Sequence, residues 1–308
     1  MMYMKANYNS VLFIVAGKGF FRDGVLSDGY KVLAPYVEHN LIERVLRELC
    51  FRLPFLPNKI WYNKEVSKEN VKYIFVSDPL ITVDYLKWLQ FLFPNAQLNF
   101  TYGNMVGKAK HIKPCDIPEG WRVWTYDDYD ARTYGLRLYH VNAYPKSFLK
   151  PKMPSEYDVL FVGKDKGRGD YLLQLERKMK LMGLKTLFII ARDGKLSPSK
   201  KYYKKAIPYE DVVELIVKSR AILNIAMEGQ EGMTMRDLES MFFGVKLLTT
   251  NKNVVKMDFY HPENVYIVDG LNIDDLPQFL NISMVEVPDE VKNKHTFDSF
   301  IEFITESA

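Results

Sequence analysis

The strongest constraint on the fold is an alternation of short apolar segments with longer amphipathic ones, which begins twice along the chain. In the first half, the pattern predicts strands at residues 11–16, 73–76 and 97–101 and helices at 41–49 and 83–93. Strands that alternate with helices indicate a parallel sheet covered on both faces. The first half is therefore predicted to be an α/β domain.

A second series follows a stretch of different composition. Residues 143–154, AYPKSFLKPKMP, hold three prolines and three lysines without periodicity, as is typical of a linker. Beyond it the pattern predicts strands at 158–162, 186–191, 221–226, 245–249 and 265–268, and helices at 171–182, 209–218 and 235–243. We therefore expect an α/β protein of two Rossmann-like domains, 1–148 and 149–308. Open sheets of this kind bind ligands at the carboxyl ends of their strands, in a cleft.

Composition limits the class of protein. A chain of 308 residues suits two domains, and 47% apolar residues can build two cores. The net charge of only +4 argues against a strongly basic nucleic-acid binder. The two cysteines, Cys50 and Cys115, have no metal-like spacing and indicate buried thiols of a cytosolic protein. No apolar run reaches the length of a membrane span, so we expect a soluble or peripheral protein.

The segment EGQEGMTMRDLESMFFG, residues 228–244, predicts an anion site at the start of a helix. Thr234 and Asp237 have the spacing of a capping box, and Gly232 lets a ligand approach the backbone. A helix N-terminus offers amide groups and a positive dipole end to an anion. Arg236 in the first turn adds a planar cation that suits phosphate oxygens. The alternative is a capped core helix that carries a surface pair of Arg236 and Glu239.

The loop KDKGRGD supplies a second candidate anion site. It places Lys164, Lys166 and Arg168 among glycines, directly after the predicted strand 158–162. Glycines allow a tight backbone, and the cations would neutralise a diphosphate. A charged surface turn is the alternative for this loop alone. Two such elements at strand ends of one domain favour a shared phosphate site.

Several longer segments carry a resemblance to a known family. They are YDVLFVGKDKGR, IPYEDVVELIVKSRAILNI with the helix segment above, DFYHPENVYIVD, and WRVWTYDDYDARTYGL in the first half. The chain resembles bacterial GT-B glycosyltransferases of capsule, exopolysaccharide and lipopolysaccharide biosynthesis. The resemblance implies two Rossmann-like domains facing each other across a cleft. Domain 1–148 would bind the acceptor and domain 149–308 the nucleotide-sugar donor.

The same resemblance implies roles for particular residues. In the retaining branch of that family, two glutamates separated by seven residues flank the helix start, a spacing that Glu231 and Glu239 share. Glu231 would lie near the sugar, although Glu228 competes for this position, and Glu239 would bind the ribose. Gly232, Thr234 and Arg236 would hold the phosphates, with Arg236 stabilising the leaving group. The cations Lys164, Lys166 and Arg168 would contact the diphosphate.

An inverting enzyme would also need a general base near the acceptor hydroxyl. Asp23, which follows the first glycine loop, is one candidate, and Asp127 or Asp130 is another. Gly17 in that loop is a candidate contact to the substrate. Gly17 also begins a dinucleotide-binding fingerprint, but Arg22 stands where its third glycine belongs.

The expected activity is a metal-independent transfer of a sugar from a nucleotide-sugar, with UDP-sugar favoured, to a saccharide or lipid-linked acceptor. No cofactor and no nucleic acid is expected. Asp128-Tyr129-Asp130 resembles the metal motif of the other large glycosyltransferase fold, but no apolar strand directly precedes it. The basic, aromatic segment KKYYKK could contact an anionic membrane surface, although a solvated turn is favoured. The alternative function is a nucleotide-sugar-binding subunit without catalysis.

Overall fold

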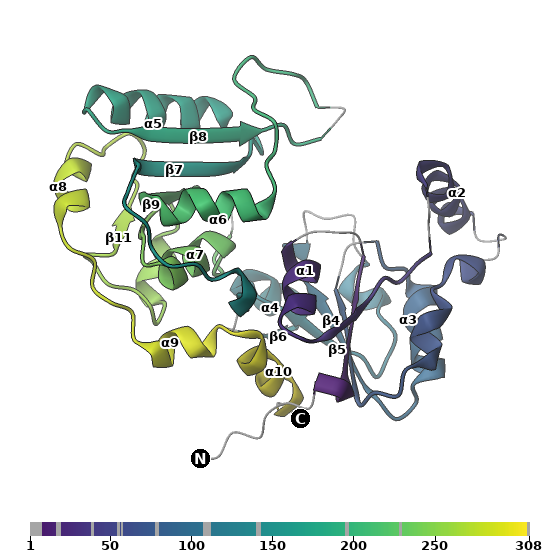
Figure 1. The fold of residues 1–308 in the computed structure, drawn as a ribbon. Coiled ribbons are helices and arrows are strands. Elements are labelled where there is room, and N and C mark those ends of the chain that lie inside the picture. The colour runs from purple at the N-terminus through teal and green to yellow at the C-terminus, as the bar shows by residue number, and fades with distance from the viewer. Residues whose placement is uncertain are drawn as a thin grey trace. The chain divides into compact units, whose positions relative to one another are not determined.

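The protein divides into two compact units in the computed structural model (Figure 1). The structure describes residues 8–16, 20–37, 40–53, 56, 58–77, 80–106, 112–139, 143–194, 197–227 and 230–306. The first unit comprises residues 1–147 and 297–308, and the second comprises 148–296. Each unit contains one parallel sheet with helices, which confirms the predicted pair of Rossmann-like domains.

The first domain is built on a six-stranded parallel sheet with the order β2-β1-β3-β4-β5-β6. The described strands are β1 (Val11–Val15), β2 (Lys31–Leu33), β3 (Tyr73–Ser77), β4 (Gln97–Tyr102), β5 (Arg122–Thr125) and β6 (Arg137–Leu138). The described helices are α1 (Phe20–Ser27), α2 (Leu41–Arg52), α3 (Val83–Leu92), α4 (Asp128–Tyr134) and α10 (Phe297–Glu306).

Strand β1, which lies between β2 and β3, is buried along its whole length because both of its faces are covered. Leu12 and Ile14 belong to a core cluster that includes residues of α3. Phe13 points to the opposite face, where its ring lies 6.4 Å from that of Phe297 in α10. A strand without a polar face is typical of a parallel sheet between two layers of helices.

Helix α10 belongs to the first domain, and this differs from the predicted domain boundary. We expected residues 149–308 in the second domain, but α10 packs on the first. Phe297, Phe300 and Ile301 enter the first-domain core that contains Phe13. The hydroxyl of Tyr30 also donates to Asp298 at 2.8 Å. The reason is that α10 buries an apolar stripe, and the matching apolar surface lies on the sheet of the first domain.

The second domain has a five-stranded parallel sheet with the order β11-β10-β9-β7-β8. Its strands are β7 (Tyr157–Lys164), β8 (Thr186–Ala191), β9 (Ser219–Asn224), β10 (Lys246–Thr249) and β11 (Val265–Ile267). Its helices are α5 (Gly169–Leu181), α6 (Tyr209–Val217), α7 (Met235–Phe243), α8 (Leu276–Asn281) and α9 (Asp289–Lys294). The chain leaves β7 toward β8 on one side and then returns to β9 on the other, so the strand order reverses between β7 and β9. Ligands of open α/β sheets bind beside such a reversal, at the carboxyl ends of the strands.

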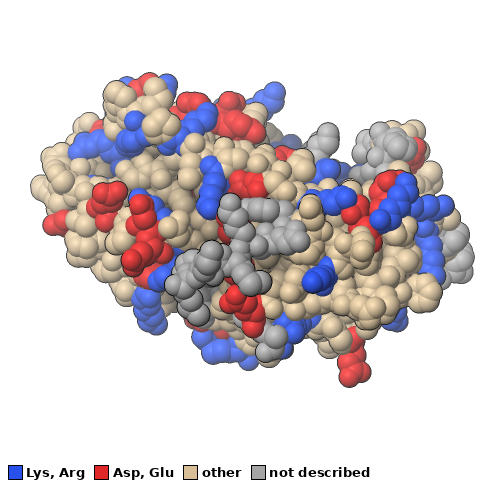
Figure 2. All heavy atoms as spheres, turned by 60° about the horizontal axis from the view of Figure 1, so that its bottom comes forward, with Lys and Arg blue, Asp and Glu red and all other residues tan. Residues whose placement is uncertain are grey.

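Two further findings concern the surface charge and the lengths of the apolar helices. Basic and acidic side chains are interspersed on the face shown in Figure 2, in keeping with the small net charge of +4. Within the ranges that the structure describes, no helix is long and apolar enough to cross a membrane.

Candidate functional site

The loop between β7 and α5 begins the candidate site. Lys166 and Gly167 both have positive φ, 49° and 80°, and this brings the chain sharply round from the strand into the helix. The backbone amide of Lys166 donates to Asp193 at 2.8 Å. Lys164 and Lys166 are both exposed at this edge of the sheet. The predicted cationic loop is therefore present at the carboxyl end of β7.

Asp165 fixes the shape of this loop, and sequence analysis missed it. Its carboxylate accepts hydrogen bonds from the amide of Gly169 at 2.6 Å and from the hydroxyls of Tyr202 and Tyr203 at 2.8 and 2.6 Å. Burial alone would raise the pKa of Asp165, but these hydrogen bonds outweigh it and hold the pKa at about 2. The segment KKYYKK is thus tied to the loop by its two tyrosines. Lys200 of that segment lies 3.4 Å from Asp165.

Gly169 is required by this close packing. A Cβ atom at Gly169 would lie 2.1 Å from the hydroxyl of Tyr202 and 2.8 Å from a carboxylate oxygen of Asp165. Both distances are shorter than any tolerable contact, so the segment with Tyr202 could not keep its place. The absence of a side chain at Gly169 therefore allows Tyr202 and Asp165 to pack against the loop.

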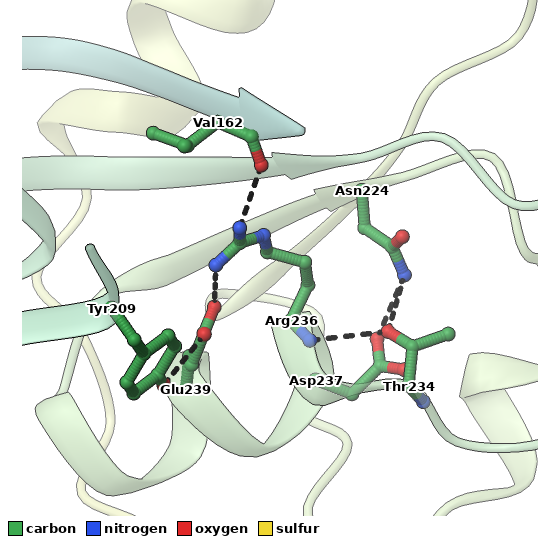
Figure 3. A network of polar contacts seen from close by, with 7 residues as sticks. All are labelled: Val162, Tyr209, Asn224, Thr234, Arg236, Asp237 and Glu239. Carbon is green, nitrogen blue, oxygen red and sulfur yellow. Dashed lines mark hydrogen bonds and ion pairs between the residues drawn. The ribbon is translucent and has the colours of Figure 1, made fainter. Parts of the chain in front are cut away.

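Arg168 and Arg236 converge where the strand order reverses. The guanidinium of Arg168 donates to the carbonyl of Ile225, just beyond β9. The guanidinium of Arg236 donates to the carbonyl of Val162 in β7 at 2.6 Å (Figure 3). Burial lowers the pKa of the Arg168 guanidinium. The nearby positive charge of Arg236 lowers this pKa further, because like charges repel each other. Two cations thus lie at the carboxyl ends of adjacent strands, and carboxylates partly offset both: Glu239 pairs with Arg236, and Asp165 and Asp193 act on Arg168.

The start of α7 has the predicted capping box. The Thr234 hydroxyl accepts from the amide of Arg236 at 3.2 Å, and the amide of Thr234 donates to Asp237 at 2.5 Å. The side-chain amide of Asn224, at the end of β9, donates to both Thr234 and Asp237 (Figure 3). We expected the helix start to present free amides, but the amides of Thr234 and Arg236 are already satisfied. The helix start also carries the cation of Arg236, which is paired with Glu239.

Asp237 is completely buried, and burial raises its pKa to about 6. The hydrogen bonds from Thr234 and Asn224 favour the ionised form but do not overcome the loss of water. The cap of α7 therefore contains a carboxyl group that titrates near neutrality.

Glu239 is 1% exposed, and both of its carboxylate oxygens are occupied. One accepts from the hydroxyl of Tyr209 at 2.8 Å, and the other accepts from Arg236 (Figure 3). A ribose hydroxyl could donate to Glu239 in place of the Tyr209 hydroxyl. In this state Glu239 orients Arg236, and its predicted contact with a ribose stays a prediction.

The other predicted residues lie in different surroundings. Glu231 is partly exposed ahead of α7, and its carbonyl accepts from Asn251 at 3.4 Å, while Gly232 is buried. Asp23 is exposed in the first turn of α1, in the first domain. Gly17 lies outside the described residues, as does Glu228.

The candidate bases Asp127 and Asp130 are both buried and both accept hydrogen bonds from backbone amides of the first domain. Asp127 caps α4 by accepting from the amide of Asp130 at 3.1 Å. Asp130 is buried and accepts from the amide of Val106 at 2.8 Å. Within the described part of the chain, no group of three or more His, Cys, Asp or Glu side chains is arranged to hold a metal ion.

Comparison with solved structures identifies the fold of the chain. No family model matches the chain, and no curated protein matches it by sequence. A sucrose-phosphate synthase from Thermosynechococcus elongatus matches with a TM-score of 0.60 and 10% identity, over 96% of this chain and 98% of that one. At this identity the likeness shows the fold alone. The chain therefore has the GT-B fold, with two Rossmann-like domains.

Two other solved structures match at lower scores. A DNA-modifying β-glucosyltransferase, solved with and without uridine diphosphoglucose, matches with a TM-score of 0.46 and 12% identity over 96% of this chain and 95% of that one. A spinosyn rhamnosyltransferase, complexed with spinosyn aglycone, matches with a TM-score of 0.41 and 9% identity over 95% of this chain and 99% of that one. Both TM-scores are too low to add to the fold that the first match shows.

Proposed function

We propose that the protein is a glycosyltransferase that moves a sugar from a nucleotide-diphosphate sugar to a saccharide or lipid-linked acceptor. The observation that carries this proposal is the convergence of Arg168 and Arg236 at the carboxyl ends of β7 and β9. Two guanidinium groups close enough to influence each other suit a diphosphate, which carries two negative charges. The fold shared with a sucrose-phosphate synthase is in keeping with a sugar substrate.

The proposed chemistry depends on the charge that develops on the leaving diphosphate. Arg236 is held by Val162 and Glu239, so its cation is already oriented before the donor binds. Preorganised charge of this kind stabilises a transition state without reorganisation, and loss of one donor typically costs about 3 kcal/mol. The exposed Lys164 and Lys166 are proposed to contact the diphosphate from the solvent side. No metal is required in this scheme.

The remaining roles come from the family resemblance and are part of the proposal. Glu231 would lie near the transferred sugar, and Gly232 and Thr234 would line the phosphate site with Arg236. Glu239 would bind the ribose after Tyr209 moves away. Asp23 would be the general base if the reaction inverts the anomeric centre. We place the activity in bacterial surface polysaccharide synthesis, in the cytoplasm and at the inner face of the membrane, with a UDP-sugar as donor.

Isothermal titration of the full chain with UDP, GDP and CMP tests the proposal. We expect at least one nucleotide, UDP first, to bind. Lys164→Gln/Lys166→Gln should weaken this binding tenfold or more, because both lysines are exposed beside the site. Arg177→Gln/Lys180→Gln on α5 is the matched control and should bind as the unchanged protein does. If none of the three nucleotides binds, the proposal is wrong.

A second function, a nucleotide-sugar-binding subunit without catalysis, is favoured by one observation. Asp127 and Asp130, two of the three candidate bases, are buried and engaged at the start of α4. Release of UDP from a UDP-sugar, with and without saccharide acceptors, distinguishes the two functions. Binding without any release of UDP would support the subunit.

A further inference from the structure

The first domain contains a pocket that takes no part in the proposed sugar transfer. The pocket has a volume of about 800 Å³ and lies beside β5 and β6, at one end of the six-stranded sheet (Figure 1). All of its lining residues lie between Val106 and Arg137, so the first unit alone forms it. Trp121 directly precedes β5, and Arg137 begins β6. The pocket therefore lies near the starts of these strands, whereas substrates of open α/β sheets bind at the carboxyl ends.

The pocket is a consequence of the connection between β4 and β5. Parallel strands are usually joined by a helix that covers the sheet. The described residues of this connection form no α-helix, and they include the short 3-10 turn Pro114–Asp116. The hydroxyl of Tyr102 donates to the carbonyl of Ile112 at 2.6 Å, and the side-chain amide of Gln90 donates to the carbonyl of Glu119 at 2.9 Å. These bonds hold the loop in place as one wall of the pocket.

The lining of the pocket is largely apolar. Val123 in β5 and Leu136, just before β6, contribute to it from the sheet, and Ile112 contributes from the loop. All three pack against the apolar cluster that contains residues of α3. Pockets for small molecules measure about 300–1,000 Å³ and are lined mainly by such side chains. The volume and lining therefore suit one small molecule with an apolar part.

The charged groups of the lining are cations. Lys113 and Arg137 line the pocket, and no Asp or Glu side chain among the described residues does. The guanidinium of Arg137 lies 5.5 Å from the ring centre of Trp124, which keeps it beside β5. Asp116, in the same loop as Lys113, is outside the lining and accepts from the thiol of Cys115 at 3.8 Å. The pocket is therefore suited to a negatively charged ligand.

The indole N–H of Trp121 lacks an acceptor. Trp121 lines the pocket and is only 8% exposed, and its Nε1 has no hydrogen-bond partner among the residues that the structure describes. Trp124 in the following strand is also buried, but its Nε1 donates to Asn99 at 3.1 Å. Buried N–H groups are normally hydrogen-bonded, because the loss of water costs free energy. A bound ligand with an acceptor oxygen would satisfy Trp121.

These observations select one class of ligand. We propose that the pocket binds a small organic acid, with its aromatic or aliphatic part against the apolar lining. Its acidic group is held by Lys113 and Arg137 and supplies an acceptor for the indole N–H of Trp121. Hydrogen bonds from cations to carboxylate or phosphate oxygens are stronger than those between neutral groups. The inference concerns the first domain alone and does not depend on sugar transfer.

Calorimetric titration of the full chain with anilinonaphthalene sulfonate, an aromatic sulfonate, tests the inference. We expect one molecule to bind per chain, and the uncharged analogue N-phenylnaphthylamine to bind at least tenfold more weakly. Octanoate or octyl phosphate should displace the bound sulfonate, whereas octanol should not. The acid that displaces it at the lower concentration identifies a carboxylate or a phosphate as the preferred group. Displacement by octanol but by neither acid would contradict the proposal.

Variants of the polar groups test how the acid is held. Lys113→Gln/Arg137→Gln should weaken binding of the sulfonate at least tenfold and leave binding of the uncharged analogue unchanged. Trp121→Phe removes the indole N–H and keeps an aromatic ring, so it should also weaken binding of the sulfonate. Lys64→Gln/Lys72→Gln, at two exposed lysines of the same domain, is the matched control and should bind normally. Urea unfolding checks that each variant is folded.

Cys115 provides a test on the unchanged protein. We expected both cysteine thiols to be buried, but Cys115 is exposed because it lies in the turn Pro114–Asp116 of the loop, and it lines the pocket. Bound sulfonate should slow the reaction of Cys115 with iodoacetamide at least fivefold, as measured by mass spectrometry of peptides. Cys50 in α2 is the internal control and should react at an unchanged rate.

Three results would overturn the inference. The first is that the sulfonate does not bind, and the second is that Lys113→Gln/Arg137→Gln binds it as tightly as the control variant does. The third is that bound sulfonate leaves the reaction of Cys115 unchanged, since the ligand would then lie elsewhere on the chain.

Discussion

At the scale of single residues, Arg236 has two roles: it stabilises the fold through its ion pair with Glu239, and it is proposed to bind the diphosphate. Its guanidinium is the ion-pair partner of the buried Glu239, so Arg236→Gln alone would leave that carboxylate with the Tyr209 hydroxyl but without a cation. We expect a loss of about 3 kcal/mol of folding free energy together with loss of nucleotide binding. The double variant Arg236→Gln/Glu239→Gln should recover most of the stability but not the binding. Urea unfolding and calorimetric titration of both variants test this, and recovery of binding in the double variant would contradict it.

Asp237 gives the second residue-scale prediction. Its pKa of about 6 in the folded protein lies above the usual value of 3.8, so the folded state binds the proton more tightly than the unfolded state. The contribution of Asp237 to stability is therefore greatest below about pH 4 and is lost as the pH rises through 6. The loss amounts to about 3 kcal/mol by pH 7.

Asp237→Asn removes this titration and keeps an oxygen for the amide of Thr234. The difference in unfolding free energy between variant and unchanged protein should shift in favour of the variant between pH 4 and pH 7. Urea unfolding at the two pH values measures it. A difference that does not vary with pH would show that Asp237 titrates normally.

At the scale of elements, the turn between β7 and α5 depends on Gly169. Gly169→Ala would push Tyr202 away from Asp165, and we expect a loss of about 1–3 kcal/mol with weaker nucleotide binding. Gly183→Ala, after the same helix, is the control. Gly183, unlike Gly169, has a positive φ of 80°, so alanine there strains the backbone, but a Cβ there meets no atom within 4 Å. Urea unfolding and titration with UDP compare the two, and equal effects on binding would contradict a role for the packed turn.

Local patterns predicted the five strands of the second domain and its helices α5, α6 and α7, but not α8 and α9. Strand β8 has the predicted bounds, and β7 extends the predicted strand by one residue before and two after, because apolar runs between turn residues mark buried strands. The capping box of α7 is also local and was predicted. Asp165 was missed because its tyrosine partners are 37 and 38 residues away, and nothing in KDKGRGD indicates them.

At the scale of the whole molecule, the two arginines at the carboxyl ends of β7 and β9 predict a reaction without a metal. The guanidinium groups of Arg168 and Arg236 can themselves take the place of a divalent cation beside a diphosphate. We expect sugar transfer to be unchanged by EDTA and nucleotide binding to weaken as salt increases. A UDP-release assay with EDTA, and then with added Mg²⁺ or Mn²⁺, measures this. Loss of activity in EDTA that either ion restores would contradict the prediction.

The return of α10 to the first domain has a consequence for biosynthesis. Residues 148–296 form one continuous unit, whereas the aromatic core around Phe13 lacks Phe297 until the chain has been translated beyond residue 296. During synthesis the later domain can therefore complete its folding before the earlier one. Any nascent chain halted before residue 297 would expose Phe13 and Tyr30 to chaperones and proteases.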